Sequence, residues 1–166
     1  MHSHLRKPNF WPRELSSLCF VLGVVLLSGP GAQAQVARNR VLELDGDGDY
    51  VALPPNIFTN LTEATVEVWA KWNSLRGYSR VFEFGAKDQS MSLFNHLTAP
   101  DLRFNLYPQN VQRVDPALRP QIRVNDLLRT NDWIHVAALS GPGGMKLYAN
   151  GVLVGEHTNA ASFADI

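Results

Sequence analysis

Residues 133–155 constrain the fold of this chain more than any other segment. An apolar run ends in a Gly-Pro-Gly-Gly turn at 141–144, and a second run at 145–149 leads into Asn150-Gly151. Asn-Gly between alternating apolar runs is a strong hairpin signal, because both central residues of a type I′ turn need positive φ angles. The segment therefore predicts three consecutive antiparallel strands, as in a meander of a β-sandwich.

The same kind of alternation continues through most of the chain. Residues 65–72 alternate with period two, which is typical of a half-buried strand, with Val66, Val68, Ala70 and Trp72 on one face. Further strands are expected at residues 41–44, 50–53, 80–84, 90–97 and 102–107, and near 122–124. No segment is a convincing helix. The sequence predicts an all-β domain of about nine or ten short strands.

The N-terminal residues have the composition of a secretory signal peptide. Basic residues are followed by an apolar run at 15–27 and an Ala-x-Ala site that ends at Ala34. The apolar run is shorter than the roughly 20 residues that span a bilayer. We expect residues 1–34 to be a signal peptide cleaved after Ala34 and residues 35–40 to be a short polar lead. The mature protein would then be secreted or periplasmic, without membrane insertion.

The expected mature chain has no cysteine and no excess of positive charge. The full sequence has one cysteine, 15 basic and 15 acidic residues. Cleavage removes Cys19, three of the basic residues and one of the acidic residues, which leaves 12 against 14 and a net charge of −2. This balance provides no electrostatic footprint for nucleic acid or an anionic membrane. A secreted domain without disulfides depends on core burial or on a bound ion.

Three segments resemble the laminin-G-like, concanavalin A-like lectin superfamily. Residues 42–51 are similar to its opening strand and D-G-x-x-D-Y-V turn, residues 65–69 to its T-V-E-x-W strand, and residues 133–155 to its W-x-H-V-A…K-L-Y-x-N-G-x-x-x-G meander. The resemblance implies an antiparallel jelly-roll β-sandwich over residues 41–166. Such domains usually continue into a last strand near the first. We therefore expect an incomplete domain, truncated at its C-terminus, with an unpaired edge that favours association.

One acidic turn is a candidate calcium site. Asp45, Asp47 and Asp49 place carboxylates at alternate positions, which suits a hard cation. The turn is not an EF-hand loop, because Tyr50 and Asn56 stand where that loop needs its glycine and its bidentate glutamate. The resemblance implies calcium ligands from separate loops. The alternative is a solvated turn in which Asp and Gly satisfy the turn geometry.

Aromatic and basic residues in or beside loops are candidates for ligand binding. Trp69 and Trp72 differ in parity, so one faces the core and the other could stack on a sugar ring. Arg76, Tyr78 and Tyr107 could line a ligand groove. We take Trp72 and these three residues as candidate ligand-binding residues; the alternative is that each is an ordinary core or surface residue.

No carboxylates have the spacing of a catalytic pair. Glycosidases of this sandwich use a Glu-x-Asp-x-x-Glu strand, and residues 43–48 begin this pattern but end in glycine. Glu63 and Glu67 would lie roughly 13 Å apart along a strand. Paired glycosidase carboxyls are ~5–9.5 Å apart. We expect no catalytic residue.

Together with the resemblance, these features predict an exported, non-catalytic recognition module. It would bind a glycan or an extracellular protein through loops at one rim of the sandwich, with or without calcium. One alternative is the extracytoplasmic sensory head of a longer signalling protein. Another is a glycoside hydrolase or lyase whose catalytic pair, including Glu43 or Glu67, forms across strands. Fold alone does not decide between them.

Overall fold

The computed structural model describes residues 40–86, 89–108 and 119–166. The expected signal peptide, its cleavage site at Ala34 and the lead up to residue 39 lie outside these residues. All the described strands belong to one compact unit, residues 43–166. Within the described part, no helix has the length and apolar character that crossing a membrane requires.

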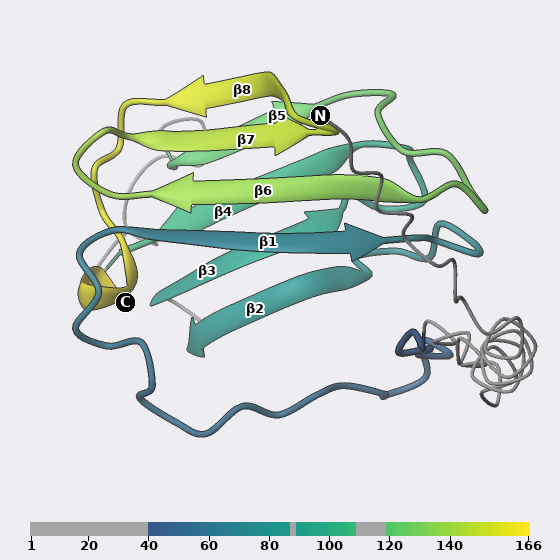
Figure 1. The fold of residues 1–166 in the computed structure, drawn as a ribbon, viewed down its shortest axis with the longest axis horizontal. Helices are drawn as coiled ribbons and strands as arrows, with labels where there is room; N and C mark the ends of the chain where they lie inside the picture. The colour runs from purple at the N-terminus through teal and green to yellow at the C-terminus, as the bar shows by residue number, and fades with distance from the viewer. Residues whose placement is uncertain (1–39, 87–88, 109–118) are drawn as a thin grey trace, which may run out of the picture. The chain divides into compact units, whose positions relative to one another are not determined.

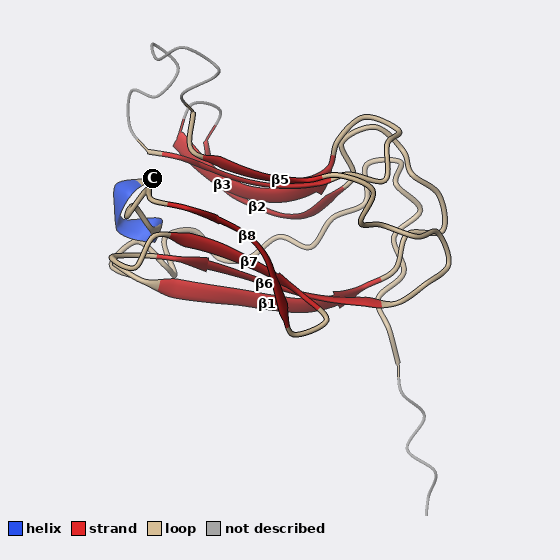
Figure 2. Ribbon diagram, turned by 90° about the horizontal axis from the view of Figure 1, so that it is seen from above, coloured by secondary structure: helices blue, strands red, loops and turns tan. Residues whose placement is uncertain are grey.

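Two four-stranded antiparallel sheets lie face to face (Figure 1, Figure 2). The first sheet has the strand order β1-β6-β7-β8 and the second has the order β2-β3-β4-β5. The strands are β1 (Ala64–Ala70), β2 (Arg80–Ala86), β3 (Gln89–Asn95), β4 (Leu102–Tyr107), β5 (Gln121–Val124), β6 (Ile134–Ser140), β7 (Met145–Ala149) and β8 (Val152–His157). A short 3-10 helix at Phe163–Asp165 follows them. The prediction of an all-β antiparallel sandwich is confirmed.

Alternation along each strand of the first sheet decides which side chains are buried. In β6, Ile134 and Val136 face the second sheet and are buried, whereas His135 between them lies on the outer face. In β1, Val66 and Val68 pack against the core, while Trp69 is 64% exposed. The alternation expected for this strand is confirmed over Ala64–Ala70, and the structure shows that the face with Val66 and Val68 is the inner one.

Asn150 and Gly151 form the tight turn between β7 and β8. Their φ angles are 49° and 80°, the positive values that a type I′ turn needs. The side-chain Oδ1 of Asn150 accepts a hydrogen bond from the backbone N–H of His135 at 3.0 Å. The backbone N–H of Asn150 donates to the carbonyl oxygen of His135 at 2.8 Å. The turn is therefore fastened to β6, and the predicted hairpin is confirmed.

The prediction of strands at residues 41–44 and 50–53 is wrong for this structure. Both segments are irregular and exposed, on either side of a bend at residues 46–48. A β-strand needs a neighbouring strand to satisfy its backbone donors and acceptors. None of the described strands pairs with these segments, although β1 and β2 each form an edge of a sheet. The result is a series of exposed apolar side chains: Val41, Leu42, Leu44, Tyr50, Val51 and Leu53.

The core lies between the two sheets and contains side chains from both. Its completely buried members include Phe104 and Leu106 from the second sheet and Val136 and Leu147 from the first. These contacts, rather than covalent links, hold the two layers together.

Leu147→Ala should lower the free energy of unfolding by about 2–5 kcal/mol, because it leaves a cavity between the sheets. Leu153→Ala is the matched control: this leucine lies on the other strand of the same hairpin and is 45% exposed. We expect the control to cost much less. Urea denaturation of both variants measures the difference, and equal losses would contradict the position of Leu147 in the core.

A candidate ligand-binding face on the second sheet

The outer face of the second sheet is concave, because its strands bow with the hollow side turned away from the first sheet (Figure 2). The strand register arranges the outward-facing side chains in rows across the sheet. One row contains Arg80, Phe94, Arg103 and Arg123, the next contains Glu83, Ser92, Asn105 and Gln121, and beyond it Ser90 lies opposite Tyr107. We call this set of residues the concave face. It is polar and rich in arginine.

An aromatic cluster lies at one end of the concave face. The ring of Tyr78 is 6.0 Å from the ring of Phe94 and 5.7 Å from that of His96, measured between centroids. The guanidinium of Arg80 lies 5.8 Å from the centroid of Phe94 and forms a 2.7 Å ion pair with Glu83. Aromatic surface therefore lies directly beside charged hydrogen-bonding groups.

Asn95 positions the loop that brings Tyr78 to this cluster. Its side chain is fully buried, and its Nδ2 donates to the carbonyl oxygens of Arg76 at 2.8 Å and Leu97 at 2.7 Å. Its Oδ1 accepts from the backbone N–H of Ser79 at 2.8 Å. Sequence reasoning missed Asn95, since a single asparagine at a strand end gives no signal of this role.

Burial and neighbouring arginines shift the ionisation of several groups on and beside the concave face. Burial lowers the pKa of Arg103, and the charge of Arg123 lowers it further. The pKa of His96 is lowered by burial and then by Arg103. Burial raises the pKa of Tyr107 against the opposing effect of the arginines around it. Arginines outnumber the carboxylate among the residues of the concave face, three against one, so the face carries a net positive charge.

The structure brings together only some of the ligand-binding residues expected from the sequence. Tyr78 and Tyr107 both belong to the region of the concave face. Tyr78 lies in the aromatic cluster at one end, and Tyr107 lies opposite Ser90 in the row at the other end. Trp72 does not, because it is 8% exposed and belongs to the core. The exposed tryptophan of that segment is Trp69, which lies on the outer face of the first sheet with its ring 5.1 Å from that of His135.

Arg76 lies at the acidic turn instead. Its side chain is 3.6 Å from the position that a Cβ atom would take on Gly46. Within the turn, Oδ1 of Asp45 accepts from the backbone N–H of Asp47 at 2.7 Å, and Oδ2 of Asp49 accepts from that of Asp45 at 3.1 Å. These carboxylates serve the turn itself. Among the described residues, no three His, Cys, Asp or Glu side chains are grouped to hold a metal ion.

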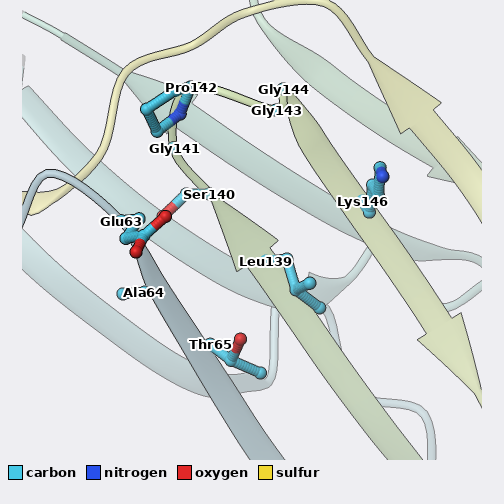
Figure 3. A pocket seen from close by; sticks show the side chains of 10 residues that line it. All are labelled: Glu63, Ala64, Thr65, Leu139, Ser140, Gly141, Pro142, Gly143, Gly144 and Lys146. Carbon is cyan, nitrogen blue, oxygen red and sulfur yellow. The ribbon is translucent and has the colours of Figure 1, made fainter.

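A separate hollow of about 380 Å³ lies beside the glycine turn between β6 and β7 (Figure 3). It is lined by Glu63, Ala64, Thr65, Leu139, Ser140, Gly141, Pro142, Gly143, Gly144 and Lys146. Its walls include one carboxylate and one ammonium group but no aromatic ring. It therefore lacks the aromatic surface on which a sugar ring stacks.

The carboxylates named as catalytic candidates lie apart from the concave face. Glu67 is on the outer face of the first sheet, where its Oε1 is 2.7 Å from Nε2 of His135. Glu43 is exposed in the irregular segment before β1.

Two packed antiparallel sheets with a concave polar outer face define a lectin-like β-sandwich. A family model for Laminin_G_3, described as the concanavalin A-like lectin/glucanases superfamily, matches residues 45–165. The chain belongs to this superfamily, as its motifs implied.

A solved structure with a similar fold is that of the Ruminococcus gnavus IT-sialidase CBM40 bound to alpha2,3 sialyllactose. The TM-score is 0.51 and the sequence identity is 17%, over 64% of this chain and 59% of the other. The match thus spans about three fifths of that protein's chain and supports the fold. No curated protein matches this sequence.

Asn95→Ala should lower the free energy of unfolding by about 1–3 kcal/mol, because it leaves buried hydrogen-bond partners of the loop unsatisfied. Asn60→Ala, the same change at an exposed residue, is the control. Denaturant unfolding measures both, and an unchanged stability for the Asn95 variant would contradict its role in positioning the loop.

Millimolar calcium should leave the melting temperature of the protein unchanged, since the carboxylates of Asp45 and Asp49 already accept hydrogen bonds from the backbone of the turn. A metal that binds only the folded state would raise the midpoint by mass action. Differential scanning calorimetry with calcium and with EDTA makes the comparison. A calcium-dependent rise that is lost in Asp47→Asn would show that the turn holds an ion after all.

Proposed function

We propose that the protein is an exported, non-catalytic recognition module that binds a glycan on the concave face of the second sheet. The observation that carries the proposal is the aromatic cluster of Tyr78, Phe94 and His96 beside the arginines of that face. Export rests on the signal-peptide pattern of residues 1–34.

The chemistry of the concave face suits a sugar. A sugar ring offers an apolar C–H surface to an aromatic side chain and a rim of hydroxyls to polar groups. Tyr78 is 45% exposed and supplies the aromatic surface. Asn105 donates from Nδ2 to the hydroxyl of Tyr107 at 2.8 Å, while its buried Oδ1 has no partner among the described residues. The glycan held by the structurally similar carbohydrate-binding module supports this choice of ligand.

The arrangement of acidic groups favours binding without catalysis. A glycosidase needs two carboxyl groups on either side of the bond that it cleaves. Glu83 is the carboxylate among the residues of the concave face, and it is already paired with Arg80. Glu67 is engaged with His135 on the other sheet.

Tyr78→Ala should weaken glycan binding about tenfold, which corresponds to ~1.4 kcal/mol of lost stacking. Trp69→Ala is the control, because it removes an exposed aromatic ring from the first sheet. Isothermal titration calorimetry on ligands found with a glycan panel measures both variants. A loss confined to the Trp69 variant would move the site to the first sheet, and release of reducing sugar by the wild type would contradict a non-catalytic role.

A further inference from the structure

Arg103 and Arg123 lie directly opposite each other on β4 and β5. Both project from the concave face, so two guanidinium groups meet on one surface. Like charges directly opposite in an antiparallel sheet are destabilising unless an anion compensates them. A negative partner would offset this repulsion.

The described residues do not supply that partner. Arg123 donates from Nε to the neutral Oε1 of Gln121 at 2.7 Å. The buried Nε of Arg103 has no acceptor among the described residues, and the same is true of Arg119. Asp101 acts electrostatically on Arg103, but its Oδ1 accepts from the backbone N–H of Asp126 at 3.1 Å.

Another arginine of the concave face does have an acidic partner. Arg80 pairs with Glu83, whereas neither Arg103 nor Arg123 forms an ion pair with a described residue. An arginine donor withdrawn from water and left without an acceptor is costly. A ligand anion would offset the repulsion between the two guanidinium groups.

We propose that Arg103 and Arg123 bind the carboxylate of an acidic sugar, whose ring lies toward Tyr78 and Phe94. Guanidinium groups match carboxylates with two parallel hydrogen bonds, which a neutral hydroxyl cannot reproduce. The lowered pKa of Arg103 agrees with this assignment, because it reports burial next to another positive charge. This inference rests on the proposed function and narrows its ligand to carboxylate-bearing glycans.

Two matched pairs of probes test the inference in calorimetry with the purified protein: 3′-sialyllactose against lactose, and oligogalacturonate against its methyl ester. We expect at least one acidic member to bind at least tenfold more tightly than its neutral counterpart. The difference should shrink as salt is raised, because salt screens charges that are partly exposed.

Arg103→Gln and Arg123→Gln should each weaken binding of the acidic probe at least tenfold. Lys71→Gln is the control, since it removes one positive charge from an exposed position just after β1. Arg103→Lys keeps the positive charge but removes the planar guanidinium that can bind a carboxylate with two hydrogen bonds. This variant should therefore also bind the acidic probe more weakly, while an unchanged melting temperature shows that it retains the fold.

The outcomes separate the inference from the proposed function. Equal binding of acidic and neutral members would overturn the carboxylate assignment and leave glycan recognition in place. Absence of binding to any glycan of a broad panel would overturn both. Citrate that binds as tightly as the acidic sugars, with the same dependence on Arg103, would overturn the assignment of a sugar.

Discussion

Burial of two apolar sheet faces against each other is the interaction on which the rest of the structure depends. The one cysteine of the sequence is at position 19, outside the described residues, so the described sandwich is held without a disulfide. Phe104 and Leu147 meet in the layer between the sheets, and Gly155 of β8 approaches Ile122 of β5 so closely that a Cβ atom at that position would collide with it. Removal of this layer would leave two sheets of four strands, each with one apolar face exposed to water.

The same register that fills the core also arranges the concave face. Because side chains alternate across a strand, Phe104 faces inward only if Arg103 and Asn105 face outward. A slip of one residue would exchange the two sets and place a guanidinium in the apolar layer. The cost of burying that charge specifies the register. The arginine row and the hydrophobic core are therefore two results of one alignment, and the chemistry of the face is as firmly determined as the packing beneath it.

Local patterns in the sequence predicted the parts of the fold that depend on local chemistry. The Asn150-Gly151 turn and the alternation in β1 were sufficient to locate strands and faces. Parity placed Trp69 and Trp72 on opposite faces, but it could not say which is buried, since both are large and apolar. The meeting of Arg103 with Arg123 depends on pairing between strands joined by a long connection. The segments at 41–44 and 50–53 look like strands, yet a strand also needs a partner, which no local pattern reveals.

The position of β1 has a consequence for how the molecule assembles. The strands β2 to β5 pair in chain order, and so do β6 to β8. Each of these two meanders can therefore form through contacts between strands that are neighbours in the chain. β1 is different, because it pairs with β6, and its contact between Glu67 and His135 joins residues 68 positions apart. Closing so long a loop costs conformational entropy, and the contacts between β1 and β6 offset this cost only after the loop has closed. We therefore expect the two meanders to form early and the docking of β1 to be the slow step that unites them.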